Sequence, residues 1–193
     1  MEPTKEAQRT LIHARLRQTT SEERATWSAA IREHVLASPA WQSARTVMLY
    51  AALRYEPDLL PLFDAAGDKR LVLPGLENDR IVARQVRDLP DLELSPGGIR
   101  EPFPLRCPAV SASEIDLVLI PGLAFARDGT RLGRGRGHYD RFLAGLPEMA
   151  IKCGVCFRCQ VLPALPSEAH DVMVSLVLTE EGSLAVIANQ KIQ

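Results

Sequence analysis

Runs of apolar, β-branched residues constrain the fold of this chain more than any other feature. Most of these runs do not alternate between apolar and polar side chains, which is typical of strands buried on both faces of a parallel sheet. The predicted strands cover residues 45–53, 70–74, 80–86, 115–122, 150–157 and 172–179. Of these, the run RIVARQV (80–86) alternates. The pattern therefore predicts a mostly parallel sheet.

Two long helices are predicted ahead of the first strand. Residues 4–19 carry apolar side chains at a helical period, with a strongly basic opposite face. A second helix is predicted to start at Ser21, whose hydroxyl can cap it. This helix must stop near Ser38 and Pro39, because the residue before a proline disfavours helical geometry.

Shorter helical patterns separate the later strands. The segments PDLLPLFDAAG (57–67) and HYDRFLAGL (138–146) are each predicted to form a short helix. Residues 88–114 are rich in proline, glycine and serine and are predicted to form a long functional loop. Strands that alternate with helices predict a three-layer α/β/α sandwich of the Rossmann-like type.

The composition is that of one globular domain, which we expect to span residues 1–193. Hydrophobic residues make up 46% and charged residues 24% of the chain, and the formal net charge is −1. A chain with almost no net charge exerts no long-range electrostatic attraction on nucleic acid or anionic lipid. Any binding of anions by basic side chains must therefore depend on a local cluster of them. The first residues are polar and lack the apolar stretch of a secretory signal. We therefore expect a cytoplasmic monomer with no nucleic-acid or membrane partner.

Three of the four cysteines are closely spaced. Cys153, Cys156 and Cys159 form a C-x2-C-x2-C pattern, and Cys107 lies far upstream. Iron–sulfur clusters are usually held by four thiolates, and a zinc site needs further ligands at close spacing. On a strand, Cys153 and Cys156 would point to opposite faces. A buried structural strand is favoured over a metal site.

The glycine-rich segment RLGRGRGHYD (131–140) is the strongest candidate for a functional site. It lies between a predicted buried strand and a predicted helix, on the side of the sheet where open α/β folds bind ligands. Gly133, Gly135 and Gly137 let the main chain approach a ligand and turn its N–H groups toward an anion. The spacing G-x-G-x-G matches neither the P-loop nor the dinucleotide fingerprint.

Charged side chains in the same segment indicate which anion it suits. Arg131, Arg134 and Arg136 can form charge-assisted hydrogen bonds with a polyphosphate. Asp140 would repel such a ligand unless a cation lay between them, and Mg²⁺ is the usual cation. Phosphate binding is favoured here, while a structural loop and a nucleic-acid contact remain alternatives.

Residues 120–143, IPGLAFARDGTRLGRGRGHYDRFL, closely resemble the signature of the 5-formyltetrahydrofolate cyclo-ligases, also called 5,10-methenyltetrahydrofolate synthetases. Further segments resemble the same family in the same order: TKEAQRTLIHARLRQTTSEER, MLYAALRYEPD, GGIREP and LPSEAHDVMV. The similarity covers nearly the whole chain. It implies the cyclo-ligase type of α/β/α sandwich.

The resemblance also implies a reaction. ATP phosphorylates the formyl oxygen of 5-formyltetrahydrofolate, N10 attacks the activated carbon, and phosphate leaves. The products are 5,10-methenyltetrahydrofolate, ADP and phosphate. Phosphoryl transfer needs positioning and charge neutralisation more than a protein nucleophile. The implied substrates are 5-formyltetrahydrofolate and ATP, with Mg²⁺ as the metal.

The family motifs imply which residues bind ATP. Lys5 and Arg9 lie one turn apart on one helix face and can reach the same phosphates. The remaining ATP-binding residues are those of the loop: Arg131, Leu132, Gly133, Arg134, Gly135, Arg136, Gly137, His138 and Tyr139. Arg134 and Arg136 are the predicted catalytic residues, because they would neutralise the transferring phosphoryl group. Without the resemblance, the alternative for Lys5 and Arg9 is a solvated basic face.

The folate and metal ligands are implied in the same way. Glu56 is predicted to hydrogen-bond the pterin, and Tyr139 to line the pocket. Asp140 and Asp171 are predicted to bind Mg²⁺, directly or through water. The alternatives are a helix cap for Asp140 and simple packing for Tyr139. His170 is equally suited to orient Asp171 or to lie on the surface.

Three positions depart from the family pattern. His138 stands where the family usually has an aromatic residue, and Gly75 stands where a basic residue often follows the proline. Ser175 replaces a second acidic residue. None of these positions is a predicted metal ligand, but Gly75 and His138 could alter substrate fit or rate.

Two other classes of function compete with the enzyme. One is a non-catalytic protein of the same fold that binds nucleotide, folate or RNA, and the other is a sugar-phosphate isomerase. An enzyme requires Lys5, Arg9, Glu56, Asp140 and Asp171 to converge on one pocket. A binding protein could keep the arginines while the acidic residues diverge.

Overall fold

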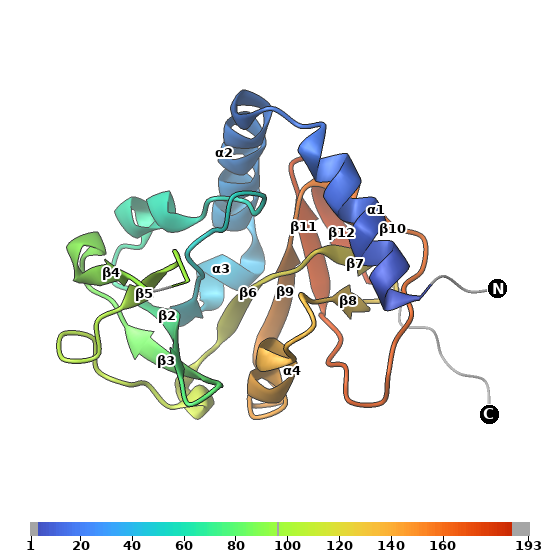
Figure 1. Ribbon diagram of the computed structural model, residues 1–193. Coiled ribbons are helices and arrows are strands. Elements are labelled where there is room, and N and C mark those ends of the chain that lie inside the picture. Colours follow the sequence, from blue (N-terminus) through green and yellow to red (C-terminus); the bar gives the residue numbers. More distant parts are fainter. Residues whose placement is uncertain (1–3, 96, 187–193) are drawn as a thin grey trace.

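A seven-stranded sheet forms the centre of the computed structural model, which describes residues 4–95 and 97–186 (Figure 1). The strand order is β12-β11-β9-β6-β1-β2-β3. The bounds are β1 Thr46–Met48, β2 Arg70–Glu77, β3 Arg80–Gln85, β6 Leu117–Pro121, β9 Ile151–Val155, β11 Leu176–Thr179 and β12 Gly182–Ala185. The five inner strands run parallel, and the two edge strands β3 and β12 are antiparallel to their neighbours. The prediction of a mostly parallel sheet is confirmed.

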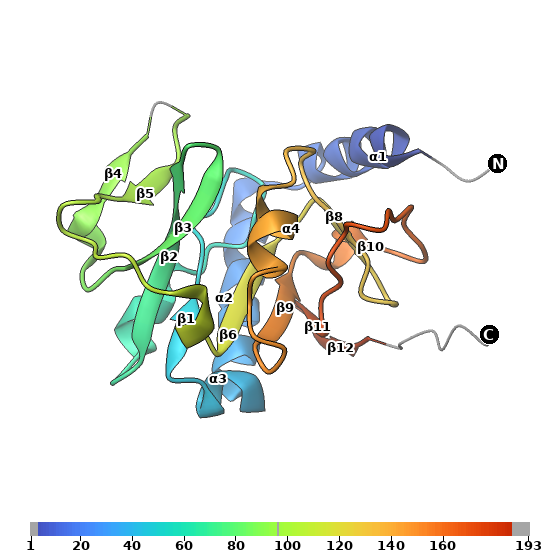
Figure 2. The same ribbon diagram turned by 90° about the horizontal axis from the view of Figure 1, so that it is seen from below.

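Helices lie on both faces of this sheet (Figures 1 and 2). Their bounds are α1 Lys5–Arg17, α2 Ser21–Ala37, α3 Pro39–Ser43 and α4 His138–Leu143. Side chains of α1, α2 and α3 join one core cluster with Val47 and Leu71 of the sheet. Leu143 of α4 joins a second cluster with Met48 and Val72. Adjacent strand residues thus face opposite layers, as the continuous apolar runs predict.

Helix α2 starts at Ser21 as predicted, but its capping residue differs from the prediction. The side chain of Thr20, not Ser21, accepts a hydrogen bond from the N–H of Glu23, while the Glu23 carboxylate accepts one from the N–H of Thr20. Ser21 is the first helical residue. This reciprocal capping box satisfies two helix-end donors, which a lone serine at the next position could not do. The helix ends at Ala37 with Ser38 as its C-cap, which confirms the predicted stop near Ser38 and Pro39.

Several other segments differ from their predicted form, and of the predicted strand 172–179 only Leu176–Thr179 pairs as a strand. Only Thr46–Met48 of the predicted strand 45–53 pairs as a strand, because the chain then turns toward the cavity described below. The predicted helix over 57–67 is a 3-10 turn, Leu60–Ala65. The predicted loop 88–114 contains the hairpin of β4 Leu92–Leu94 and β5 Arg100–Pro102. The other 3-10 turns are Leu89–Asp91, Ala112–Glu114 and Arg158–Gln160.

A small second sheet, which was not predicted, supports the glycine-rich segment. It has the order β10-β7-β8, with β7 Ala124–Ala126, β8 Arg131–Leu132 and β10 Val161–Leu162. The segment therefore leaves β8 of a hairpin and does not follow β6 directly. The buried Gln160 side chain donates to the carbonyls of Gly122 and Leu123 at 3.0 and 3.1 Å, which fixes the corner between β6 and β7.

Three of the four cysteines, Cys107, Cys153 and Cys156, are buried, and Cys159 is partly buried. Cys153 belongs to the first core cluster and Cys156 to the second, so they lie in different layers as predicted. All four cysteines are free thiols, and burial raises the pKa of each. Within residues 4–95 and 97–186, no group of three or more His, Cys, Asp or Glu side chains is placed to hold a metal ion.

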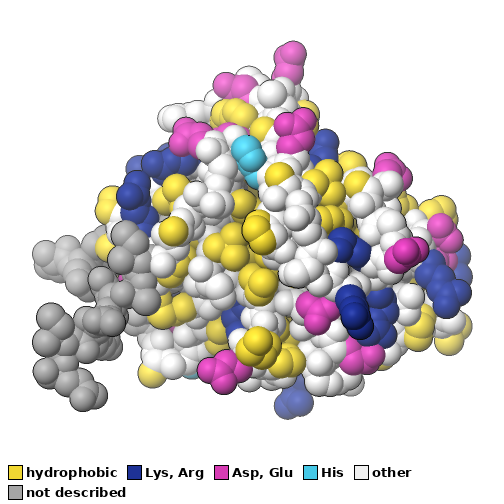
Figure 3. Space-filling view, turned by 180° about the vertical axis from the view of Figure 1, so that it is seen from behind, with side chains coloured by type: hydrophobic (Ala, Val, Ile, Leu, Met, Phe, Trp, Pro, Cys, Tyr) yellow, Lys and Arg dark blue, Asp and Glu magenta, His cyan; other side chains and the backbone are white. Residues whose placement is uncertain are grey.

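The face seen from behind carries both basic and acidic side chains, so charge of one sign does not dominate it (Figure 3). Hydrophobic side chains gather in the middle of this face. This mixture is consistent with the formal net charge of −1. No helix of the described part of the chain is long and apolar enough to cross a bilayer.

Candidate functional site

A cavity of about 830 Å³ opens at the carboxyl ends of β1 and β6. Tyr50 follows β1, and Pro121 and Gly122 end β6; all three line the cavity. The chain places β2 on one side of β1 and β6 on the other, so the strand order reverses at this point. Open α/β folds bind ligands at such a switch point.

Every site residue predicted from the sequence lines this one cavity. They are Lys5, Arg9, Glu56, Arg131, Leu132, Gly133, Arg134, Gly135, Arg136, Gly137, His138, Tyr139, Asp140 and Asp171. Helix α1 brings Lys5 and Arg9 from one side of the molecule, while β2, β3 and the β4–β5 hairpin form the other side (Figure 1). The acidic and basic residues therefore do not diverge.

The glycine-rich loop presents main-chain donors to the cavity. Gly135 has φ of 100° and Gly137 has φ of 63°, a backbone region that side chains with a Cβ rarely adopt. No group within residues 4–95 and 97–186 accepts a hydrogen bond from the N–H groups of residues 133–137. Arg9 Nε donates to the Gly133 carbonyl at 3.2 Å, which ties α1 to the loop. Helix α4, which follows the loop, has six residues.

An ion pair joins the two ends of this loop. Arg131 is 6% exposed, and its Nη2 donates to Asp140 Oδ1 at 2.8 Å. Its guanidinium lies 5.7 Å from the centre of the Tyr139 ring. A Cβ on Gly133 would lie 3.0 Å from Arg131 Nη1, so the guanidinium packs closely against the main chain of the loop. Arg131, predicted to contact phosphate, is thus engaged in holding the loop closed.

Arg134 and Arg136 differ in what they contact. Arg134 donates from Nη2 and Nε to Glu56 Oε1 at 2.9 and 3.2 Å, which connects the loop to the segment after β1. The other Glu56 oxygen accepts from the N–H of Leu53 at 3.0 Å. The guanidinium of Arg136 donates to no group in the part of the chain that the structure describes, and the residue is exposed. Arg136 could therefore bind a ligand without first breaking an ion pair, whereas Arg131 and Arg134 are already paired.

Lys5 holds the far end of the cavity through two carboxylates. Its Nζ lies 2.7 Å from Asp171 Oδ2 and 3.1 Å from Glu168 Oε1. Burial alone would lower the pKa of Lys5, but the hydrogen bonds to Asp171 and Glu168 hold it above its ordinary value. Burial alone would raise the pKa of Asp171, but hydrogen bonds from Lys5 and the Glu168 N–H hold it below its ordinary value. His170 is mostly exposed, and its Nε2 lies 3.7 Å from Asp171 Oδ1.

These two shifts predict how the docking of α1 depends on pH. The stabilisation from the lowered pKa of Asp171 is present above pH 3.8 and is lost as the pH falls through the folded pKa. That from the raised pKa of Lys5 is present below pH 10.5 and is lost as the pH rises through the folded pKa. Replacing Lys5 by Met should move the pKa of Asp171 upward. Carboxyl NMR titration of both proteins measures this, and an unmoved Asp171 pKa would exclude the pair.

His138, the departure inside the loop, binds a turn. Its Nε2 lies 2.7 Å from Asp79 Oδ1, and Arg141 Nη2 donates to Asp79 Oδ2 at 3.0 Å. The hydrogen bond with His138 lowers the pKa of Asp79. Asp79 and Asn78, with φ of 61° and 47°, form the tight turn between β2 and β3. His138 thus lines the cavity but uses one ring nitrogen to fasten α4 to this hairpin.

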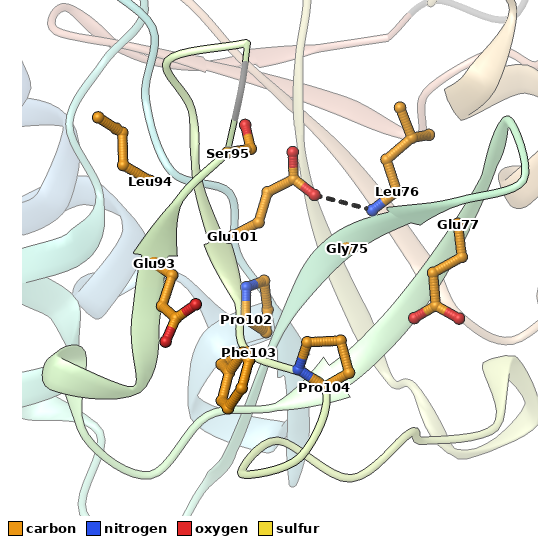
Figure 4. A pocket seen from close by; sticks show the side chains of 10 residues that line it. All are labelled: Gly75, Leu76, Glu77, Glu93, Leu94, Ser95, Glu101, Pro102, Phe103 and Pro104. Atoms are coloured by element: carbon orange, nitrogen blue, oxygen red, sulfur yellow. Dashed lines mark hydrogen bonds between the residues drawn. The ribbon is translucent and has the colours of Figure 1, made fainter.

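A smaller pocket of about 230 Å³ adjoins the cavity beside β2 and the β4–β5 hairpin (Figure 4). The two share Gly75, Leu76, Ser95 and Glu101. Glu101 accepts a hydrogen bond from the N–H of Leu76 at 3.0 Å, which holds the hairpin against β2. Gly75, the second departure, contributes only main chain to the shared wall and leaves it open.

Asp140 and Asp171 are the carboxylates that could hold a magnesium ion. The hydrogen bonds of the described residues engage Oδ1 of Asp140 and Oδ2 of Asp171. The second oxygen of each accepts no hydrogen bond from the described residues, although His170 Nε2 lies 3.7 Å from Asp171 Oδ1. Carboxylate oxygens are the ligands that Mg²⁺ prefers. Mg²⁺ commonly binds one or two carboxylates together with waters and substrate phosphates. The donor set fits an ion of this kind.

Several residues of the site escape sequence reasoning. Tyr50 is buried against the cavity, Asp79 anchors His138, and Glu168 shares Lys5 with Asp171. Tyr50 had a usable signal, because it lies at the carboxyl end of a predicted parallel strand. Asp79 and Glu168 lie in turns whose position relative to the loop depends on the tertiary fold.

A model of the 5-formyltetrahydrofolate cyclo-ligase family matches residues 1–180 of the chain. The 5-formyltetrahydrofolate cyclo-ligase of Mycolicibacterium smegmatis is 35% identical over 154 residues, 75% of this chain and 78% of that protein. The mouse 5-formyltetrahydrofolate cyclo-ligase is 26% identical and covers 89% of this chain and 91% of its own length. The structure of Aquifex aeolicus 5,10-methenyltetrahydrofolate synthetase superimposes with a TM-score of 0.85 at 29% identity, covering 98% of this chain and 96% of that one.

Proposed function

The chain belongs to the 5-formyltetrahydrofolate cyclo-ligase family, and we propose that the cavity at the carboxyl ends of β1 and β6 is its active site. The protein is an ATP-dependent ligase that converts 5-formyltetrahydrofolate to 5,10-methenyltetrahydrofolate.

The ATP phosphates bind the glycine-rich loop in this proposal. The observation that carries it is the set of loop N–H groups at residues 133–137, which lack acceptors among the described residues and lie in a cavity that also receives Lys5 and Arg9. Main-chain donors together with cations are the usual means of holding phosphate. Arg9 already contacts the Gly133 carbonyl, so α1 is in place when nucleotide arrives.

The folate lies toward the other side of the cavity, where the lining is more apolar. Leu76, Ile81 and Ile99 come from β2, β3 and the β4–β5 hairpin and suit the flat faces of an aromatic ligand. Glu56 hydrogen-bonds the pterin ring, and Tyr139 packs beside it. The Glu56 carboxylate is almost fully buried, so a hydrogen bond made there counts strongly toward orientation.

The chemistry follows from these positions. The formyl oxygen attacks the γ-phosphorus of ATP, ADP leaves, and Arg136 and Arg134 neutralise the charge that spreads over the phosphoryl oxygens. Arg134 can do so only by turning away from Glu56, because the two are paired without ligand. N10 then attacks the formyl carbon and loses its proton, and the carbon–oxygen bond to phosphate breaks. No protein nucleophile is required.

Asp140 and Asp171 hold Mg²⁺ in the same proposal, directly or through water. A bound magnesium ion would supply further neutralisation of the phosphate charge. The chain's own contribution is to hold both carboxylates in place beside the phosphates. Arg131 and Lys5 do this by pairing with one oxygen of each.

The test mixes the protein with 5-formyltetrahydrofolate, ATP and Mg²⁺ and follows the methenyl product by its near-UV absorbance. We expect turnover that requires ATP and falls when Mg²⁺ is chelated. Folded protein that forms no product would contradict the assignment. Product formation without ATP would contradict the phosphoryl-transfer mechanism.

A further inference from the structure

The hydroxyl of Tyr50 is buried at the cavity wall without a partner. The residue is 2% exposed, and no atom of the described chain accepts or donates a hydrogen bond at Tyr50 Oη. Nearly all buried side-chain polar atoms in folded proteins are hydrogen-bonded, so each exception needs a reason. Tyr50 also lines the 830 Å³ cavity, so a bound molecule can reach it.

The position of Tyr50 in the fold determines which part of the cavity its hydroxyl can reach. It follows β1 directly, at the point where the strand order reverses, and precedes the segment that carries Glu56. The negative charge of Glu56 acts on both Tyr50 and Tyr139, so the three side chains share one region. Burial, with these neighbours, raises the pKa of Tyr50 well above its ordinary value, and the hydroxyl keeps its proton.

The chemistry of the missing partner follows from these neighbours. A neutral hydroxyl that keeps its proton acts as a donor toward a ligand acceptor. Because a buried carboxylate lies in the same region, a phosphate oxygen would be repelled there, whereas a neutral carbonyl would not. A ligand edge that offers N–H donors to Glu56 and a carbonyl oxygen to Tyr50 meets both requirements.

We propose that Tyr50 is a specificity-determining residue, whose hydroxyl donates a hydrogen bond to a carbonyl oxygen on the pterin head group of the folate. This inference rests on the proposed function. Tyr50 would then donate a hydrogen bond to the carbonyl oxygen of the ring edge, and Glu56 would accept hydrogen bonds from the adjacent N–H groups. Binding of that ring would give the hydroxyl the partner that the described residues do not supply.

The test is Tyr50→Phe, which removes the hydroxyl and keeps the ring. Tyr55→Phe is the matched control, because Tyr55 packs against Arg24 and Arg54 and does not line the cavity. Calorimetry gives the Kd for 5-formyltetrahydrofolate without ATP, and kinetics give KM for each substrate. For Tyr50→Phe we expect folate binding to weaken about tenfold. The KM for ATP should stay within about twofold, and the Tm should be unchanged or higher.

Each other outcome decides against the inference. An unchanged folate Kd in Tyr50→Phe, with a wild-type protein that binds folate, would overturn the role of Tyr50 alone. A lower Tm with equal losses for folate and ATP would show a structural hydroxyl and overturn it too. A wild-type protein that binds no 5-formyltetrahydrofolate would overturn the proposed function and the head-group assignment together.

Discussion

Replacing Arg136 by alanine is expected to lower kcat by about three orders of magnitude. An arginine that neutralises a transferring phosphoryl group contributes about 10³–10⁵ in rate. Arg136 is exposed in the cavity, and its guanidinium has no partner among the described residues, so its loss should leave the free energy of unfolding within about 0.5 kcal/mol of wild type. Steady-state kinetics with ATP varied, together with urea denaturation, measure both quantities.

Arg127→Ala is the matched control for this result. Arg127 is also exposed, lies in the β7–β8 hairpin four residues before Arg131, and does not line the cavity. The Arg127→Ala substitution removes the same charge from the same region of the chain and should leave kcat and the KM for ATP unchanged. An Arg136→Ala enzyme with wild-type kcat and KM for ATP would show that the loop does not act on the phosphates.

Replacing Asp140 by alanine is expected to lower the free energy of unfolding by about 3 kcal/mol. The substitution leaves the Arg131 guanidinium buried without its ion-pair partner, and removing one member of a buried pair costs about 3–5 kcal/mol. Because Arg131 and Asp140 stand at the two ends of the glycine-rich loop, the loop should also lose its closed form. Urea denaturation measures the first effect, and amide exchange of residues 133–137 measures the second.

A double-mutant cycle with Arg131→Met separates this pairing from other roles of Asp140. The double variant should be more stable than Asp140→Ala, because it leaves no uncompensated charge inside the protein. Strictly additive losses would contradict the ion pair. Asp140→Asn addresses the metal separately: activity followed across a Mg²⁺ titration should need more Mg²⁺, and a wild-type titration curve would exclude Asp140 as a metal ligand.

Much of the fold was predictable because its strands are buried on both faces. Residues 117–120 of β6 and 153–155 of β9 are all buried, so their apolar runs are continuous and easily recognised. The two-residue strands β8 and β10 have no such pattern, because they are defined only by pairing with β7. The edge strand β12 is likewise short and half exposed. Local periodicity cannot reveal elements that exist only through their neighbours.

The candidate site was predictable in its members but not in its contacts. The spacing of glycines and arginines located the loop, and the family resemblance added Lys5 and Asp171. Arg131 pairs with Asp140, whereas Arg136 lines the cavity without such a partner. This difference follows from the hairpin of β7 and β8, which the sequence did not indicate. His138 was unexplained because its partner Asp79 lies 59 residues away in a turn.

The ion pair between Lys5 and Asp171 has a consequence for the order of folding. It joins residues 166 positions apart in sequence, so it closes one of the longest loops in the chain. The entropy lost in closing a loop grows with its length, and such contacts form after local ones. Helix α1 should therefore dock last, on a sheet that is already assembled. The wall of the cavity that carries Lys5 and Arg9 is then completed only in that step, so the proposed nucleotide site depends on the last contact to form.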